Sequence, residues 1–190
     1  MGFKDIPVDS NRVKSGLNSL ETVIACRCIN VGLFISDDIR RTVQVSLCVG
    51  LDTDLRIISF SGEKIKRVSP DERSISFFLS KAMYLLDKMD SGTVKSMDNG
   101  IVLSRTDMKN FLTSWSAERV HIADSSVDTH DWAAVSTSGF FVYDMSGVLM
   151  RGLAKRPVLL LTRPTNPERF ILDVNLQCDR LQMSSPKKAS

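Results

Sequence analysis

Residues 41–62, RTVQVSLCVGLDTDLRIISFSG, contain the pattern that decides the fold class. Every second residue from Val43 to Val49 is apolar, which is typical of a strand with one buried face. The segment LRIISFSG is a second apolar run, and it stops at Gly62. The stretch therefore predicts two strands that follow each other closely along the chain.

Residues 69–89, SPDERSISFFLSKAMYLLDKM, predict a helix directly after these strands. Ser69 is a suitable N-cap, Pro70 suits the first helical position, and Glu72 completes an S-x-x-E capping box. Apolar residues then recur at the spacing of one buried helical face. They are Ile75, Phe78, Leu79, Ala82, Leu85, Leu86 and Met89.

Outward from this unit, apolar runs and helical spacings alternate along the chain. We expect helices over 20–35 and 106–118, strands over 101–105, 119–123, 139–145 and 157–162, and loops over 90–100 and 124–132. The segment 169–176 is compatible with a strand or a helix. This alternation predicts an α/β fold with a largely parallel sheet and helices on both faces. The expected organisation is an irregular arm over 1–18, one domain over 19–182 and a disordered basic tail over 183–190.

Composition sets bounds on the class of protein. The chain has 190 residues, 43% of them hydrophobic and 25% charged, so one globular domain is expected. The net charge of +3 does not by itself indicate a nucleic-acid partner. The four cysteines lie in apolar contexts and are expected to be reduced and buried. We see no signal peptide and no apolar run long enough for a membrane span, which predicts a cytoplasmic protein with no membrane partner.

Familiar catalytic signatures are not found in the sequence, which has no G-x-G-x-x-G, P-loop, H-E-x-x-H or G-x-S-x-G motif. His121 and His130 have no cysteines near them in the sequence, so no metal site is expected. Tyr143 and Asp144 end an apolar strand, where α/β folds bind ligands. Alternatively, Asp144 caps the following turn.

Basic residues gather in two places. The turn DDIRR places Arg40 and Arg41 after two aspartates, and the arginines either pair with carboxylates inside the protein or contact phosphate. Lys66, Arg67 and Arg73 surround the start of the 69–89 helix, and a helix N-terminus beside guanidinium groups favours anions. The clustering raises RNA binding as a hypothesis.

Taken in order and spacing, CRCINVGLFISDDIRR, IISFSGEKIKRVSPDERSISFFLSKA and DNGIVLSR resemble the archaeal tRNA pseudouridine N1-methyltransferases of the SPOUT superfamily. The resemblance is strong over 20–105. It implies a C-terminal trefoil knot, S-adenosylmethionine as cofactor, a homodimer, and methylation of N1 of the pseudouridine at position 54 in the T-loop of tRNA. It also implies that tRNA or another structured RNA is the partner.

The resemblance also assigns roles to individual residues. Asp38 and Arg41 would be catalytic. Arg40, Arg41, Lys66, Arg67 and Arg73 would bind RNA. The cofactor would lie against Ile122, Ala123, Tyr143, Asp144, Arg163, Pro164 and Phe170.

The C-terminal half departs from the family pattern. Tyr143 stands where the family has a glycine that lets the backbone approach the cofactor, and Phe170 stands where it has a cysteine. The segment 148–164 is also shorter. These departures leave two alternatives open: a SPOUT-like RNA-binding or ribosome-assembly protein that has lost the cofactor, or an enzyme that methylates a different RNA.

Overall fold

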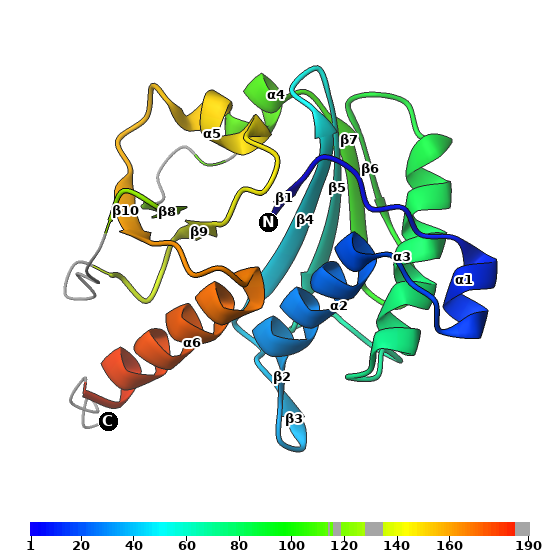
Figure 1. Ribbon diagram of the computed structural model, residues 1–190, viewed down its shortest axis with the longest axis horizontal. Coiled ribbons are helices and arrows are strands. Elements are labelled where there is room, and N and C mark those ends of the chain that lie inside the picture. Colours follow the sequence, from blue (N-terminus) through cyan, green and yellow to red (C-terminus); the bar gives the residue numbers. More distant parts are fainter. Residues whose placement is uncertain (114, 116–118, 128–134, 185–190) are drawn as a thin grey trace.

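The computed structural model describes residues 1–113, 115, 119–127 and 135–184. They form a five-stranded sheet and a three-stranded sheet flanked by helices, with a short hairpin at one end (Figure 1). The elements of the larger sheet and its helices are β1 (Gly2–Phe3), α1 (Ser10–Ser15), α2 (Leu20–Leu33), β4 (Gln44–Leu51), β5 (Asp54–Ser61), α3 (Glu72–Asp87), β6 (Thr93–Ser96), β7 (Val102–Thr106) and α4 (Met108–Thr113). The hairpin is β2 (Phe34–Ile35) and β3 (Asp38–Ile39). The remaining elements are β8 (Val120–Asp124), β9 (Phe140–Val142), α5 (Val148–Leu153), β10 (Leu159–Thr162) and α6 (Pro167–Ser184).

The five-stranded sheet corrects the expectation of a largely parallel arrangement. Its order is β1-β4-β5-β7-β6, and only β1 and β4 pair in parallel. Two residues, Asp52 and Thr53, join β4 to β5. So short a connection permits only an antiparallel hairpin, because a parallel crossover needs a dozen or more residues.

The three-stranded sheet is parallel throughout, with the order β10-β8-β9. The two sheets meet at β1, whose Gly2 N–H donates to the Tyr143 carbonyl at 3.0 Å while the Met145 N–H donates to the Gly2 carbonyl at 2.9 Å. The fold is therefore mixed α/β, with the parallel part confined to the C-terminal side and the β1–β4 pair.

Helices cover both faces of the larger sheet, as expected. Val45 and Leu47 of β4 point to one face and pack with α2 and α3, whereas Cys48 of β4 and Ile57 of β5 point to the other and pack with α4 and α5. The period-2 alternation of β4 and β5 thus builds two cores from one pair of strands.

The start of α3 differs from the expected capping box. Asp71 is the N-cap, and its carboxylate accepts from the Ser74 N–H at 2.8 Å. Ser69 lies outside the helix, where its N–H donates to the Ser74 hydroxyl at 3.0 Å. Two good capping residues lie two positions apart, and the structure uses the second one.

The first 18 residues are not the irregular arm that their polarity predicted. They contain β1 and α1, and Phe3 and Ile6 are 2% and 1% exposed in the main core. The expected loop over 90–100 likewise contains β6, whose four residues are all exposed and so give no alternation of apolar side chains. The ambiguous segment 169–176 is helical within α6, which extends to Ser184.

The other expected elements are present with bounds that are shorter or shifted by one residue, and α4 is described over Met108–Thr113 within the expected helix over 106–118. Residues 114, 116–118, 128–134 and 185–190 lie outside the described residues, and so does His130. No helix in the described part of the chain is long and apolar enough to cross a membrane. Among the same residues, no group of three or more His, Cys, Asp or Glu side chains is placed to hold a metal ion.

Candidate active site at the strand ends and the adjoining cavity

The carboxyl ends of β8, β9 and β10 lie together because these strands are parallel and in register. This arrangement brings Ala123, Tyr143 and Arg163 to one edge of the small sheet, where Phe170 from α6 packs against them. The strand ends thus bring together residues that the sequence predicted for the cofactor. Ile122 is an exception, since its side chain faces the opposite core with α4 and α5.

Tyr143 fills the centre of this edge. Its side chain is 3% exposed, and its hydroxyl donates to the carbonyls of Pro164 at 2.7 Å and Thr165 at 3.2 Å. The Arg163 guanidinium lies 4.1 Å from the ring centroid, and the Phe170 ring lies 5.8 Å away. Burial raises the pKa of the Tyr143 phenol, so the hydroxyl stays protonated and acts as a donor.

Asp144 is fully engaged by its own turn. One carboxylate oxygen accepts from the Ser146 N–H at 3.0 Å and hydroxyl at 2.8 Å, and the other accepts from the Met150 N–H at 2.9 Å. A Cβ placed on Gly2 would lie 2.2 Å from the Asp144 carboxylate, so the site also requires a glycine on β1. The observed contacts match the alternative in which Asp144 caps the turn before α5.

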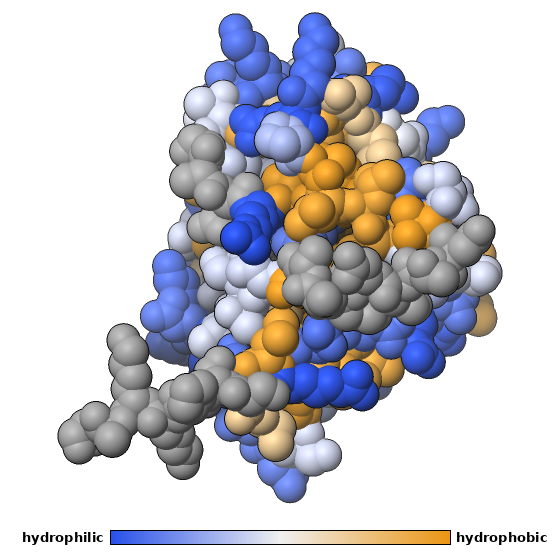
Figure 2. Space-filling model, turned by 90° about the vertical axis from the view of Figure 1, so that its left-hand side faces the viewer, coloured by the Kyte–Doolittle hydropathy of each residue, from blue (hydrophilic) through white to orange (hydrophobic). Residues whose placement is uncertain are grey.

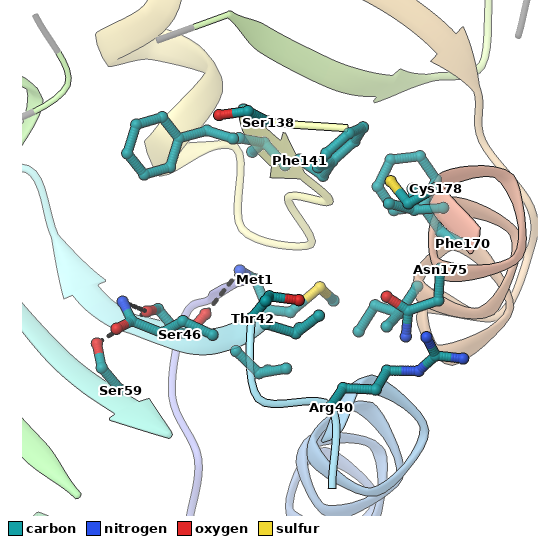
Figure 3. Close-up of a pocket in the computed structure, with 18 of the residues that line it drawn as sticks. Met1, Arg40, Thr42, Ser46, Ser59, Ser138, Phe141, Phe170, Asn175 and Cys178 are labelled. Atoms are coloured by element: carbon teal, nitrogen blue, oxygen red, sulfur yellow. Dashed lines mark hydrogen bonds between the residues drawn. The ribbon is translucent and has the colours of Figure 1, made fainter. Parts of the chain in front are cut away.

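A cavity of about 780 Å³ adjoins this cluster (Figure 3). It lies between the start of β4, the segment 137–142 and one side of α6. Of the seven residues predicted for the cofactor, Phe170 alone lines it. Its volume falls within the range of about 300–1,000 Å³ that is typical of small-molecule sites.

The cavity walls combine aromatic and polar groups. Phe140 stacks on Trp115 with centroids 4.2 Å apart, and Phe141 stacks on His121 at 4.6 Å. Opposite them, the Ser46 hydroxyl lies 2.8 Å from the Ser59 hydroxyl.

Asn175 completes the polar side of the cavity from α6. Its amide nitrogen donates to the carbonyls of Val31 and Gly32 at 3.2 and 3.3 Å, and its side-chain oxygen is directed into the cavity (Figure 3). Sequence reasoning missed Asn175, Ser46 and Ser59. The available signal was the position of two serines within the apolar strands β4 and β5.

Arg40 joins the two halves of the molecule. Its guanidinium forms a bidentate pair with Asp179 of α6, at 2.7 and 2.8 Å, across 139 residues of sequence. Its side chain is 17% exposed, and the Nε atom is buried with no hydrogen-bond partner. Of the two readings of DDIRR, an internal carboxylate pair therefore describes Arg40, although its partner is distant.

Arg41 is placed differently from its neighbour. It lies 3.8 Å from Asp38, and the two side chains are 60% and 64% exposed. One of its guanidinium nitrogens also donates to the Gly62 carbonyl at 3.3 Å. The predicted catalytic pair of Asp38 and Arg41 is thus brought together at the surface, beside the cavity-lining residues 40 and 42.

Lys66, Arg67 and Arg73 are exposed near the start of α3. Arg67 adopts the left-handed conformation with φ of 57°, and its guanidinium donates to the Asp98 carbonyl at 3.3 Å. Lys14 of α1 lines a small surface cavity together with Arg73 and extends the set of cations. We call Arg41, Lys66, Arg67 and Arg73 the basic face.

One known protein family matches most of the chain. Residues 6–144 match the model of the family described as "Putative SAM-dependent RNA methyltransferase". The chain belongs to this RNA methyltransferase family. The matched range contains the basic face, the hairpin β2–β3 and the strand end at Tyr143–Asp144.

Individual relatives agree with this family assignment. The chain is 34% identical over 113 residues to a tRNA (pseudouridine(54)-N(1))-methyltransferase of Methanococcus aeolicus, which covers 59% of this chain and 50% of the relative. The corresponding protein of Methanococcus maripaludis is 34% identical over 119 residues, covering 62% and 54%. The chain therefore spans about half the length of the curated relatives it matches.

A solved structure shares the fold of this family member. The Nep1 protein of Archaeoglobus fulgidus, crystallised with S-adenosylhomocysteine, superposes with a TM-score of 0.54 over 93% of this chain and 81% of that one. The two sequences are 11% identical, so this likeness concerns the fold alone.

Proposed function

We propose that the protein is an S-adenosylmethionine-dependent RNA methyltransferase acting on N1 of pseudouridine 54 in tRNA. The observation that carries the proposal is the family match over 6–144, which includes both the basic face and the strand end at Tyr143. The names of the relatives supply the RNA and the base.

The basic face supplies the contacts that such a substrate requires. Arg41, Lys66, Arg67 and Arg73 are exposed cations that would neutralise RNA phosphates. The Asp38 carboxylate lies 3.8 Å from Arg41 and is 64% exposed, so it is accessible to a base. In this proposal Asp38 accepts the N1 proton of pseudouridine, and Arg41 holds the negative charge that develops on the ring.

The strand-end cluster and the cavity differ in their fit to the cofactor. Tyr143 occupies the space that a close-approach glycine would leave free, and its hydroxyl is held by two carbonyls. The adjoining cavity has the volume and the mixed lining for a nucleoside with a charged side chain. S-adenosylmethionine, when bound, would supply a methyl group on a sulfonium sulfur. Phe141, Phe170 and Asn175 would hold it.

Calorimetric titration with S-adenosylmethionine tests this placement. Ser138 is exposed and lines the cavity, so Ser138→Trp should abolish binding by filling the space. Tyr143→Phe removes only the buried hydroxyl and should leave the affinity within about threefold. Thr93→Trp, on the exposed strand β6, is the matched control. Equal binding by Ser138→Trp and the control would exclude the cavity as the cofactor site.

Transfer of a labelled methyl group to T-loop RNA tests the activity itself. Substrates with uridine and with pseudouridine at position 54 should differ, because only pseudouridine offers a protonated N1. Asp38→Asn should lower the rate by about 10²-fold or more, since a positioned base contributes roughly 10²–10⁴-fold. Methylation of both substrates at equal rates would contradict the proposed target.

A second candidate is favoured by the packing around Tyr143. The filled strand end and the fully engaged Asp144 carboxylate suit a protein that keeps the fold for RNA binding or ribosome assembly without the cofactor. Tight RNA binding with no detectable S-adenosylmethionine binding at millimolar concentration would establish this second candidate and reject the first.

The quaternary structure and knot belong to the same proposal. Apolar residues gather on the face that carries β10 (Figure 2), where Leu159 and Leu160 are 39% and 43% exposed. We assign this face to a homodimer of a cytoplasmic protein, with the knot formed by the chain around β8–β10. A monomer mass by light scattering at micromolar concentration would count against the dimer.

A further inference from the structure

Helix α3 carries an unusual combination of side chains on its outer face. With 3.6 residues per turn, Arg73, Phe77, Lys81, Tyr84 and Lys88 fall within about 80° of the helix circumference. We call these five residues the α3 stripe. The opposite face contains Ile75, Leu79, Ala82 and Leu86, which are all 0% exposed.

The two rings of the stripe lie outside the main core, and Phe77 touches its margin through an edge-on contact with Phe78 at 5.3 Å. Phe77 and Tyr84 are 46% and 60% exposed, although the buried face of the helix is complete without them. A single exposed apolar residue is ordinary in a soluble protein. Two aromatic rings about 10 Å apart along one helix, at 1.5 Å per residue, form a more specific feature.

Each ring is paired with a lysine. The Lys81 ammonium lies 4.4 Å from the centroid of Phe77, and the Lys88 ammonium lies 3.9 Å from that of Tyr84 and also donates to its hydroxyl. The nearest carboxylate of α3 on this side, Asp87, is neutralised by Arg56 at 2.6 Å. The stripe therefore alternates cations with π faces and contains no carboxylate.

We propose that the α3 stripe binds an unpaired RNA strand, with bases stacked on Phe77 and Tyr84 and phosphates held by Lys81 and Lys88. Stacking platforms interleaved with cations are the means by which proteins hold single strands without reading their sequence. Base stacking uses the ring faces that the lysines now cover, and the flexible lysine stems reach outward to the backbone.

The location of the stripe supports this occupant. It begins at Arg73, which belongs to the basic face, and follows α3, which lies across the larger sheet from β8–β10 (Figure 1). A strand held there would be continuous with RNA on the basic face, and in this respect the inference rests on the proposed RNA-binding function. An apolar protein partner fits less well, because docking would bury two ammonium groups beside the rings without supplying anions.

Fluorescence anisotropy with a labelled 12-nucleotide RNA that lacks secondary structure tests the stripe directly. Phe77→Leu with Tyr84→Leu keeps apolar side chains but removes both rings, and should weaken binding about tenfold or more per ring. Lys81→Ala with Lys88→Ala should lower the slope of log affinity against log salt by about 1.4. Lys109→Ala with Lys155→Ala removes the same charge from exposed positions elsewhere and is the matched control.

A base analogue whose fluorescence changes on stacking provides a second readout. Its signal should change on binding to the parent but not on binding to the double leucine variant. Affinity of the leucine variant equal to that of the parent would overturn the proposal. Loss of a dimer, rather than of RNA, in that variant would assign the stripe to a second copy of the chain and would overturn it too.

The assay separates this inference from the proposed function. It needs no cofactor and no methyl transfer, so ring-dependent RNA binding would uphold the stripe even if the protein had no enzymatic activity. Conversely, methylation of tRNA by the leucine variant with an unchanged KM would reject the stripe while leaving the enzyme intact.

Discussion

The two sides of the molecule differ in the size of their hydrophobic cores. The N-terminal side, around β4, β5, α2 and α3, has one continuous core that includes Phe60, Ile58 and Leu79 at 0% exposure. The strand ends of β8–β10, α6 and Val135 form a smaller core, which has six buried residues among those described and is centred on Tyr143 and Phe170. The family match over residues 6–144 includes β4, β5, α2 and α3 but neither β10 nor α6, so the two sides also differ in how much of them the match covers.

Thiol chemistry gives the largest expected difference between the two sides. Burial raises the pKa of Cys26 and of Cys28 to about 12, which cuts their thiolate fractions at pH 8 by roughly a thousandfold. Burial also raises the pKa of Cys178 on α6, but this side chain is only half-buried. In the native protein iodoacetamide should modify Cys178 first, at least about a hundredfold faster than Cys26 or Cys28, as measured by peptide mass spectrometry.

The same shifts set a pH dependence of stability. The folded state holds the Cys26 and Cys28 protons more tightly than the unfolded chain does, so this contribution is complete below pH 9 and is lost as the pH rises towards 12. The free energy of unfolding should therefore fall above pH 9. Cys26→Ala with Cys28→Ala should flatten that decline. In the iodoacetamide experiment, modification of Cys26 as fast as that of Cys178 at pH 8 would show that the N-terminal core opens as readily as the C-terminal core.

Truncation of one phenylalanine in each core tests whether the sides unfold together. Phe60→Ala and Phe170→Ala should each cost about 3–5 kcal/mol, since both rings are fully buried. Hydrogen exchange should separate them. Phe60→Ala should speed exchange throughout the chain, whereas Phe170→Ala should speed it in β8–β10 and α6 while β4 and β5 stay protected. Equal acceleration everywhere would mean that the small core is not an independent unit.

The division also explains what could be predicted from the sequence. Helices α2 and α3 and strands β4 and β5 follow clear periodicities, because each packs one face against the main core. The two-residue link at Asp52–Thr53 also encoded the antiparallel hairpin, although the alternation of helices and strands pointed to a parallel sheet. Strand β6 could not be found, since all its residues are exposed and no periodicity results.

The candidate site was predictable only in part. Residues at the ends of parallel strands must meet, so the clustering of Tyr143, Arg163 and Ala123 follows from the strand assignments. The cavity does not follow, because it forms where Ser46 of β4 faces Asn175 of α6. No local pattern specifies a contact across so much sequence, and the Arg40–Asp179 pair is hidden for the same reason.

The neighbouring residues Arg40 and Arg41 test whether the Arg40–Asp179 pair links the two sides of the molecule. Arg40→Ala would leave Asp179 without its bidentate partner and should cost about 1–3 kcal/mol of stability. Arg41→Ala removes an exposed pair at 3.8 Å and should cost no more than about 1 kcal/mol. The order should be reversed for RNA affinity, because Arg41→Ala should weaken RNA binding more than Arg40→Ala does. A double-mutant cycle of Arg40→Ala with Asp179→Ala measures the coupling, and a coupling near zero would remove the pair as a link.

The smallest effect is expected at Arg67, where stability and function oppose each other. Its φ of 57° is unfavourable for a side chain with a Cβ, whereas glycine adopts it freely. Arg67→Gly should therefore stabilise the N-terminal side by about 0.5 kcal/mol after the extra entropy of the unfolded chain is counted. Asp37, with φ of 63°, is the matched control. Aspartate tolerates this conformation better, so Asp37→Gly should gain less.

In RNA titrations Arg67→Gly should bind more weakly, with a salt slope smaller by about 0.7–0.9, because one phosphate contact is lost. Asp37→Gly should keep the parental salt slope. In the proposed function, contact with RNA offsets the strain at Arg67, and a variant that gains stability without losing RNA affinity would remove Arg67 from the basic face.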